Sequence, residues 1–437
     1  MTYREVLDYL YTQTPLFQNS GASAYKEGLY NTLQLDERTG HPHKLFKTIH
    51  VAGTNGKGSV SHTLAAILQA QGYKTGLYTS PHLLDFRERI RVNGKCISPE
   101  YVINFIEENK SFLESLHPSF FEVATAMAFS WFAQTEIDIA VVETGLGGRL
   151  DCTNIIDPRL SIITNIGFDH VRFLGDTLNK IAYEKAGIIK PGRPVVIGEY
   201  EPETRPVFEA KAKECNSRIV FAQDLDIIKA RKEISYNKVI YQADGFPDLE
   251  SALTGDCQVH NAATILASVQ ELRKCRIKID DSSVRQGFQN VCRTTGLMGR
   301  WQKVASRPDI ICDTGHNSHG IKYIAAQLRN IASAPGFGKL RIVMGMVNDK
   351  DITAVLDLMP ENAEYYFAKA SVDRALDSTE LKSMAEKAGL HGRAYPNVAM
   401  ALSAARSDSS LKDLIFVGGS TFIVADLLAL PDFFIIS

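Results

Sequence analysis

The stretch from residue 50 to residue 59 reads His-Val-Ala-Gly-Thr-Asn-Gly-Lys-Gly-Ser and lies between an apolar segment (45–49) and a helical pattern (60–68). Its glycines let the backbone take positive φ and approach a bulky anion closely. Turn amides and the positive end of the following helix then attract phosphate. A lysine can bridge the terminal phosphates, and a serine hydroxyl can lie near Mg²⁺. The run predicts a nucleoside-triphosphate cradle made by Gly53, Thr54, Asn55, Gly56, Lys57, Gly58 and Ser59.

This run departs from the usual phosphate-loop pattern. The lead glycine stands only three residues before Gly56, and Gly58 separates the lysine from the hydroxyl, whereas the common loop has four intervening residues and adjacent lysine and hydroxyl. The competing interpretation is a glycine-rich turn with a solvated lysine. We favour the cradle, because strand, glycines, lysine, hydroxyl and helix all occur in the required order.

Two further polar residues follow apolar, strand-like runs. Glu143 follows 140–142 and opens the glycine-rich stretch 143–151, and His170 follows the run 160–164 at a short distance. Carboxyl ends of parallel strands are where such sheets bind ligands, and Mg²⁺ prefers hard oxygen donors such as a carboxylate. Glu143 is therefore expected to bind metal. For His170 the alternative is an ordinary polar residue, since imidazole is less typical for Mg²⁺.

Composition limits the class of protein. The 437 residues exceed one typical core, and the content of 45% hydrophobic and 22% charged residues is that of a globular protein. A formal net charge of −2 offers no basic excess for nucleic acid, and no segment has the length or character of a membrane span or signal peptide. Seven cysteines, none in a C-x-x-C pair, are expected to be reduced and buried. The sequence predicts a cytoplasmic protein.

Strand-like runs alternate with amphipathic helical patterns almost throughout, which predicts α/β architecture with mostly parallel sheets. A first series extends to the helical pattern 282–291, and a second begins with strands at 309–312, 340–344, 364–367 and 414–417. Helices of the second series are expected to begin near residues 318, 351, 378 and 398. The boundary is placed in the glycine-bearing stretch at Leu297. This gives a P-loop ATPase-like domain, 1–296, and a smaller Rossmann-like domain, 297–437.

The run Gly-Thr-Asn-Gly-Lys-Gly-Ser resembles the Mur-ligase superfamily, specifically its branch of folylpolyglutamate synthases and dihydrofolate synthases. Further motifs extend the resemblance from about residue 25 to residue 428. It implies an ATP- and pterin-substrate-binding first domain and a glutamate ligase second domain. It also implies that Lys185, in the run Glu-Lys-Ala-Gly-Ile, is carbamylated and binds magnesium with Glu143 and His170. Ser80, in Thr-Ser-Pro-His, matches a ligand of a first magnesium that Glu143 shares. By spacing alone, Lys185 would be a solvated surface charge.

The resemblance also assigns the acid substrate. Arg89, within the charged segment 85–90, matches a functionally important arginine near the folate site, although the segment alone would be interpreted as an exposed charge cluster. Three segments are implied to line the pterin pocket: Lys26, Glu27 and Gly28; Ser119, Phe120, Phe121 and Glu122; and Leu150, Asp151 and Cys152. Asp151 is also a candidate catalytic residue. The two phenylalanines could stack on a pteridine or belong to the core, which is their commoner place.

In the second half, five residues are implied to contact nucleotide or glutamate. Asn261 and Asp313 match nucleotide-binding positions, and Arg300 stands at the predicted domain junction, where a guanidinium can reach a phosphate. His316 and Ser420 match positions linked to the incoming glutamate. The family pattern Asp-x-Ala-His-Asn-Pro has Gly315 for alanine and Ser318 for proline here, which predicts a less rigid loop.

These matches imply an ATP-dependent ligase that adds L-glutamate to 7,8-dihydropteroate and to folyl-glutamates through an acyl phosphate, with ATP and Mg²⁺ as cofactors. A monomer that binds neither membrane nor nucleic acid is expected. One alternative is a Mur-type ligase acting on a UDP-linked muramyl acid, although no separate UDP-binding domain precedes the phosphate loop. A P-loop kinase or NTPase is a second alternative, and a non-catalytic binding protein is the third.

Overall fold

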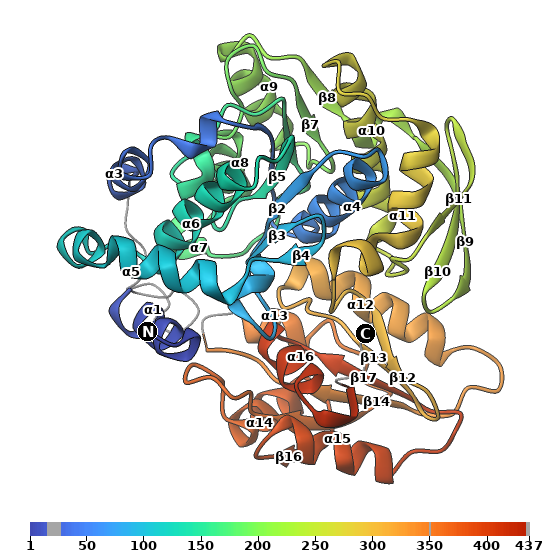
Figure 1. Ribbon diagram of the computed structural model, residues 1–437. Coiled ribbons are helices and arrows are strands. Elements are labelled where there is room, and N and C mark those ends of the chain that lie inside the picture. The colour runs from blue at the N-terminus through green and yellow to red at the C-terminus, as the bar shows by residue number, and fades with distance from the viewer. Residues whose placement is uncertain (15–27, 349–350, 434–437) are drawn as a thin grey trace. The chain divides into compact units, whose positions relative to one another are not determined.

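A computed structural model describes residues 1–14, 28–348 and 351–433. The chain divides into two compact units, drawn mainly from blue to yellow and from orange to red in Figure 1. The first consists of Met1–Lys232, Ile240–Ala252 and Gln258–Leu297, and the second of Glu233–Val239, Leu253–Cys257 and Met298–Ser437. The predicted domain 1–296 therefore differs from the first unit by two short segments. One reason is that Asp256 donates its backbone N–H to the side chain of Gln327, a residue of the second unit, at 3.0 Å.

The first unit is built on an eight-stranded sheet in the order β4-β3-β2-β5-β1-β6-β7-β8. The pairings β2–β5, β5–β1, β1–β6, β6–β7 and β7–β8 are parallel, and the pairings β2–β3 and β3–β4 are antiparallel. The prediction of a mostly parallel α/β sheet is thus confirmed. The strands are β1 Lys47–Ala52, β2 Thr75–Tyr78, β3 Ile90–Val92, β4 Lys95–Cys96, β5 Ile139–Glu143, β6 Leu160–Ile163, β7 Val195–Ile197 and β8 Ile219–Phe221.

Central strands of this sheet are buried on both faces. All residues of β5 and β6 are buried, as are all but the first residue of β1, which is typical of parallel sheets with helices on both sides. The helix after β1 is itself core, because every residue from Ser59 to Leu68 is buried. The helices are α1 Tyr3–Gln13, α3 Tyr30–Arg38, α4 Lys57–Ala70, α5 Pro99–Leu116, α6 Phe120–Gln134, α7 Val171–Leu174, α8 Leu178–Ala186, α9 Arg205–Glu214, α10 Gln258–Lys274 and α11 Asp281–Thr295.

Short elements complete this part of the chain. A three-stranded sheet has the order β11-β10-β9. Its strands are β9 Ile228–Ser235, β10 Lys238–Ala243 and β11 Phe246–Ser251, and the 3₁₀ turns are η2 Pro42–Lys44, η3 Phe86–Arg89, η4 Cys152–Ile155 and η5 Ala222–Leu225. Over the described ranges, no helix is both long and apolar enough to cross a membrane. The cysteines are free as predicted, but only Cys215 and Cys312 are buried and Cys292 is exposed.

The second unit contains a six-stranded sheet in the order β12-β13-β17-β14-β15-β16. All neighbours are parallel except β12 and β13, so the expected Rossmann-like arrangement of strands and helices is present. Its strands are β12 Gln302–Ala305, β13 Asp309–Cys312, β14 Leu340–Met344, β15 Glu364–Ala368, β16 Gly392–Tyr395 and β17 Leu414–Gly418. Its helices are α12 Ser318–Ala332, α13 Ile352–Leu356, α14 Ser378–Lys387, α15 Val398–Ser407, α16 Thr421–Leu428 and the 3₁₀ turn η6 Pro431–Phe433.

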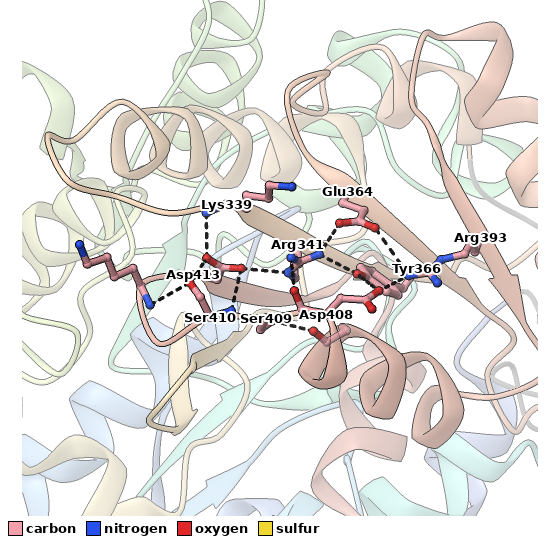
Figure 2. Close-up of polar contacts among 11 residues, drawn as sticks. Lys339, Arg341, Glu364, Tyr366, Arg393, Asp408, Ser409, Ser410 and Asp413 are labelled. Atoms are coloured by element: carbon pink, nitrogen blue, oxygen red, sulfur yellow. Dashed lines mark hydrogen bonds and ion pairs between the residues drawn. The ribbon is translucent and has the colours of Figure 1, made fainter.

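A polar network joins the amino ends of three strands in the second unit (Figure 2). Arg341 of β14 donates to Asp413 at 3.1 Å and to the Tyr366 hydroxyl at 2.8 Å, and it also pairs with Glu364. The Tyr366 hydroxyl in turn donates to Asp408 at 2.8 Å. Burial alone would raise the pKa of Asp413, but hydrogen bonds from Ser410, from backbone amides and from Arg341 hold it below its usual value. The network thus joins the amino ends of these strands. The candidate site residues are found at the opposite, carboxyl ends.

Candidate active site

The phosphate loop joins the buried strand β1 to the buried helix α4. Gly53 has φ 148° and Gly56 has φ 81°, and neither position has room for a side chain. A Cβ at Gly53 would stand 1.8 Å from Thr164 Oγ1, and one at Gly56 would stand 2.3 Å from Asn261 Oδ1. Gly56 is the N-cap of α4, and no side chain caps the helix there. The first backbone amides of the helix are therefore available to bind an anion. The geometry is that of a phosphate cradle.

Asn165, which follows β6, holds the first half of this loop. Its backbone carbonyl accepts from the Thr54 amide at 3.0 Å, and its side-chain oxygen accepts from the Asn55 amide at 2.9 Å. Those two amides are therefore engaged with protein, and the amides that can meet phosphate begin at Gly56. Sequence reasoning missed Asn165, although a polar residue directly after a buried strand was a usable signal.

Residues of α10 reach the same loop. Gln258 donates to the Ser59 hydroxyl at 3.2 Å and accepts from the Asn261 amide at 2.9 Å. The structure thus brings Asn261 and the serine of the loop together across about 200 residues of sequence, as a shared nucleotide site requires. Gln258 was not predicted, because nothing in its sequence context distinguishes it from other polar helix residues.

Two lysines share one carbonyl at the loop. The Lys57 ammonium donates to the Gly53 oxygen at 3.0 Å, and so does that of Lys185 of α8, also at 3.0 Å. Lys185 is only 4% exposed, so the interpretation of it as a solvated surface charge is wrong. Burial, together with the nearby positive charge of Lys57, lowers the pKa of Lys185 to about 7. A substantial fraction of this side chain is therefore a neutral amine near neutral pH.

Two of the expected metal ligands, Glu143 and Ser80, lie at the carboxyl ends of the neighbouring strands β5 and β2. Glu143 is the buried last residue of β5 and pairs in register with Val51, two residues before the phosphate loop. Ser80 follows β2, the other neighbour of β5, and His170 precedes α7 in a left-handed conformation, φ 51°. Within the described ranges, no three His, Cys, Asp or Glu side chains form a metal cluster. Glu143 and Ser80 offer hard oxygen atoms that fit Mg²⁺, whereas an ammonium at Lys185 fits only after modification to an anion.

Arg89 is buried, so the interpretation of residues 85–90 as an exposed charge cluster is wrong for this residue. It donates to His82 Nδ1 at 2.8 Å, and its guanidinium lies 5.1 Å from the ring centre of Phe120. Burial and the charge of Arg89 lower the pKa of His82 to about 3, so the imidazole is neutral. Phe120 belongs to the core, while the half-buried Phe121 stacks on Tyr78 at 5.6 Å. Of the two phenylalanines, only Phe121 keeps a ring surface for a ligand.

Several predicted pocket residues also accept hydrogen bonds from backbone amides and so fix the local backbone conformation. Ser119 and Glu122 form a capping box at the start of α6, in which Glu122 accepts from the Ser119 amide at 2.6 Å. Asp151 accepts from the backbone amides of Gly145 and Leu146, both at 2.8 Å. The half-buried Leu150 and Cys152 flank Asp151, Gly28 precedes α3, and Lys26 and Glu27 lie outside the described residues.

In the second unit, the predicted residues gather after β13. Asp313 accepts from the Trp301 amide at 2.7 Å and from the Gly315 amide at 2.8 Å. Burial raises its pKa, and the charge of Arg300 opposes that shift. Arg300 itself donates to the Gly299 carbonyl at 3.1 Å and to the Thr314 hydroxyl. The structure therefore places Arg300 near Asp313, two residues that the sequence assigned separately to the nucleotide.

His316 and Ser420 have defined hydrogen-bonding states. His316 Nδ1 lies 2.9 Å from the Thr314 carbonyl, which can only accept, so Nδ1 carries a proton and donates in this contact. Ser420 is buried and caps α16 by accepting from the Ile423 amide at 3.2 Å. Its hydroxyl hydrogen can still be donated to a ligand.

Known proteins resemble the chain over nearly its full length. The Mur ligase middle domain matches residues 51–269, and the glutamate ligase domain of Mur ligases matches residues 299–421. A dihydrofolate synthase/folylpolyglutamate synthase from Bacillus subtilis is 31% identical over 92% of this chain and 94% of its own. This chain belongs to that family. It is therefore a ligase of the Mur type.

Solved structures of family members have the same fold. The Escherichia coli FolC in complex with DHPP and ADP superposes with a TM-score of 0.84 at 29% identity, covering 98% of this chain and 97% of that one. A bifunctional folylpolyglutamate synthase/dihydrofolate synthase from Yersinia pestis, complexed with AMPPNP and a manganese ion, gives a TM-score of 0.81 at 31% identity and covers 98% of each chain. The family and the fold class that the sequence predicted are both confirmed.

Proposed function

We propose that this protein uses ATP to join L-glutamate to 7,8-dihydropteroate and to folyl-glutamates, forming an acyl phosphate and releasing ADP and phosphate. The observation that carries the proposal is the grouping of a phosphate loop, the buried Glu143 and the buried Lys185 around the carboxyl end of β1. The names of the relatives support the choice of substrates. The adenine nucleotides in the solved relatives support ATP.

In the first unit, one group of residues binds the phosphates of ATP and a second group would hold the metal ion while the acid substrate is activated. The α4 amides and Lys57 bind the phosphates of ATP and stabilise the charge that develops as a substrate carboxylate attacks the γ-phosphate. Glu143, Ser80, His170 and a carbamylated Lys185 would hold Mg²⁺, which supplies Lewis-acid neutralisation of phosphate charge. Carbamylation requires a neutral amine, and the burial of Lys185 favours that form. Manganese in the Yersinia pestis relative supports a divalent cation here.

Residues of the second unit serve the nucleotide and the amino acid. Arg300 and Asp313 bind nucleotide, and His316 and Ser420 bind glutamate. The neutral amine of glutamate attacks the acyl carbonyl, and the bond from the carbonyl carbon to the phosphate oxygen breaks. The amine nitrogen gives one proton to the released phosphate as the amide forms. Water has to be kept from the acyl phosphate, because it would hydrolyse that intermediate.

In the first unit, Arg89, Asp151 and the three pocket segments bind the pterin-bearing acid. Phe121 supplies a half-exposed aromatic surface for the pterin, since Phe120 is in the core. The buried Arg89 cation fits an acidic substrate. We place the protein in the cytoplasm, as a monomer acting on small molecules. Its seven cysteines, all within the described ranges, are free thiols, as is usual in a reducing compartment.

A coupled assay of ADP release tests the proposal. ADP and phosphate should form only when Mg²⁺, ATP, dihydropteroate or a folate, and L-glutamate are all present, and each single omission should abolish release. AMP and pyrophosphate as products would contradict the acyl-phosphate route. Equal ATP turnover without glutamate would indicate a kinase or NTPase, and turnover only with a UDP-linked muramyl acid would indicate a different Mur-type ligase.

A further inference from the structure

A buried hydrogen-bond chain connects β1 to the glycine-rich loop 144–151 that follows β5. His50, in the interior of β1, is fully buried, and its Nε2 lies 2.8 Å from the Thr153 hydroxyl oxygen. The Thr153 hydroxyl also bonds to Asp151 Oδ1. Asp151 Oδ2 accepts from the amides of Gly145 and Leu146, both at 2.8 Å. The chain therefore runs from one strand of the sheet to the backbone of a loop.

The direction of each hydrogen bond follows from the chemistry of the groups. Burial raises the pKa of Asp151, and the hydrogen bonds that it accepts oppose that shift. Three backbone amides point at its carboxyl group, including that of Thr153 at 3.0 Å from Oδ1, and amides can only donate, so both oxygens act as acceptors, as in a carboxylate. The Thr153 hydroxyl then gives its single hydrogen to Asp151 and has a lone pair left to accept from His50. His50 therefore carries its proton on Nε2. Burial lowers the pKa of His50 to about 3, so the ring is neutral.

This use of His50 leaves its other nitrogen unsatisfied. Among the described residues, His50 Nδ1 is buried and has no hydrogen-bond partner, which costs stability compared with an apolar residue of similar size. Leucine or valine would fit the interior of a strand as well as histidine does. The bond from Nε2 to Thr153 is thus the feature of His50 that an apolar side chain cannot replace.

The loop held by this chain is also tied to elements that carry site residues. Thr144 donates to the Val51 carbonyl at 2.9 Å, and Arg149 donates to the Glu184 carbonyl, next to Lys185, at 2.7 Å. Glu143 directly precedes the loop, and Leu150 to Cys152 end it. A shift of the loop would therefore move the predicted substrate segment, while the phosphate loop stays fixed by Asn165.

We infer that His50, acting through Thr153 and Asp151, is a positioning residue that sets the loop against which the pterin-bearing acid binds. The inference rests on the proposed function, because that function assigns residues 150–152 to the acid substrate. Loss of the chain should weaken binding of the acid and leave binding of ATP unchanged, since the phosphate loop has separate supports.

The test compares Thr153→Val and His50→Leu, which break the chain, with Thr153→Ser and His50→Gln, which keep a hydroxyl and an N–H donor. Ser268→Ala is the matched control, since among the residues that the structure describes this fully buried hydroxyl bonds only within its own helix, to the Thr264 carbonyl at 2.7 Å. KM and kcat are measured for each substrate. Thr153→Val should raise the KM for the acid about tenfold, the effect of losing one hydrogen bond to a charged group. His50→Leu removes a hydrogen bond between neutral groups and should raise this KM about fivefold. The KM for ATP should be unchanged in both variants.

The double variant Thr153→Val/His50→Leu should be no worse than Thr153→Val alone, because in this chain His50 acts on the loop through Thr153. Thr153→Ser and His50→Gln should restore the wild-type KM, and Ser268→Ala should leave it unchanged. Multiplicative losses in the double variant would overturn the inference. So would an equal rise in the KM for ATP, or a fall in Tm with no change in the KM for the acid.

Hydrogen exchange of segment 144–152, measured without substrates, separates this inference from the proposed function. The Gly145 and Leu146 amides should exchange faster in Thr153→Val than in wild type, and Thr153→Ser should restore their protection. If wild-type protein released no ADP in response to the acid, the proposed function would fail, and exchange alone would decide whether the chain holds the loop. Unchanged exchange in Thr153→Val would overturn the inference.

Discussion

At the scale of single residues, two lysines at the phosphate loop have different proposed roles. Lys57 and Lys185 both donate to the Gly53 carbonyl, yet Lys57 begins a helix at the cradle and Lys185 is buried on another helix. Two ammonium groups on one carbonyl repel each other, so the more deeply buried lysine is the one that loses its proton. These positions support the proposal that Lys57 binds phosphate and that Lys185 undergoes a modification that needs a neutral amine.

Lys57→Ala should abolish turnover while leaving the fold intact. The lysine is only half-buried and bonds to carbonyls of its own loop, so its removal should lower Tm by no more than a few degrees. Loss of its charge at the transferred phosphate should reduce kcat by about 10²-fold or more, the usual effect of removing a preorganised electrostatic group. Lys74→Ala, at an exposed lysine of the same unit, is the control and should be as active as wild type. Near-normal activity of Lys57→Ala would show that the loop is a glycine-rich structural turn and not a phosphate-binding site.

Activity should rise as the pH rises through about 7 and should increase with added bicarbonate. The pKa of Lys185 is lowered to about 7, so the amine is mostly protonated below that pH and mostly neutral above it, and only the neutral form is carbamylated. Lys185→Ala should be inactive, with partial rescue by a small carboxylate. Lys185→Arg keeps a cation that cannot form the carbamate and should be at least as damaging. An active Lys185→Arg enzyme, or a wild type indifferent to bicarbonate after CO₂ is removed, would contradict carbamylation.

At the scale of elements, the second unit followed its sequence pattern closely. Strands β13 and β14 have the predicted limits, and α12, α14 and α15 begin at residues 318, 378 and 398 as expected. The reason is local: Asn317, Asp377 and Asn397 each accept a backbone hydrogen bond at the helix start, and such residues mark helix starts in a sequence. By contrast, β12 and β16 were not predicted, because both are half-exposed edge strands without a continuous apolar run.

The first strand was also placed too early, at 45–49 instead of Lys47–Ala52. Periodicity assigns a polar His50 to the turn, and only the three-dimensional structure shows that this histidine has a buried partner on another element. A polar residue inside a strand is therefore misread whenever its hydrogen-bond partner is distant in sequence.

Arg341→Met should destabilise the protein by about 3–5 kcal/mol, the usual effect of removing one partner of a buried ion pair. Arg341 and Asp413 are both nearly inaccessible, so the variant would leave a buried carboxylate without its cation. Arg393→Met, at the half-exposed edge of the same network, should cost about 1 kcal/mol or less. Urea unfolding measures both. The kcat per folded molecule should not change, because the network lies at the amino ends of the strands, and a lower kcat would show that it reaches the site.

At the scale of the whole molecule, the sequence predicted the two-part architecture, the cradle and the strand-end position of Glu143, because these depend on local order along the chain. It could not predict the burial of Lys185 or Arg89, which depends on packing between segments distant in sequence. Nor could it predict Asn165 and Gln258 beside the phosphate loop. These residues act through single hydrogen bonds that leave no periodic signal.

One active site should accept both dihydropteroate and a mono-glutamylated folate. The two acids share the pterin and differ at the end that receives glutamate, while the predicted pterin segments 119–122 and 150–152 both belong to the first unit. ADP release is measured with each acid alone and with both at saturation. Competition for one site should give a mixed rate between the two separate rates, whereas independent sites would give their sum. Thr153→Val should raise the KM for both acids by a similar factor, because the loop it disturbs contacts the part that they share. Activity with the folate and none with dihydropteroate would make this enzyme one that only extends existing glutamate chains.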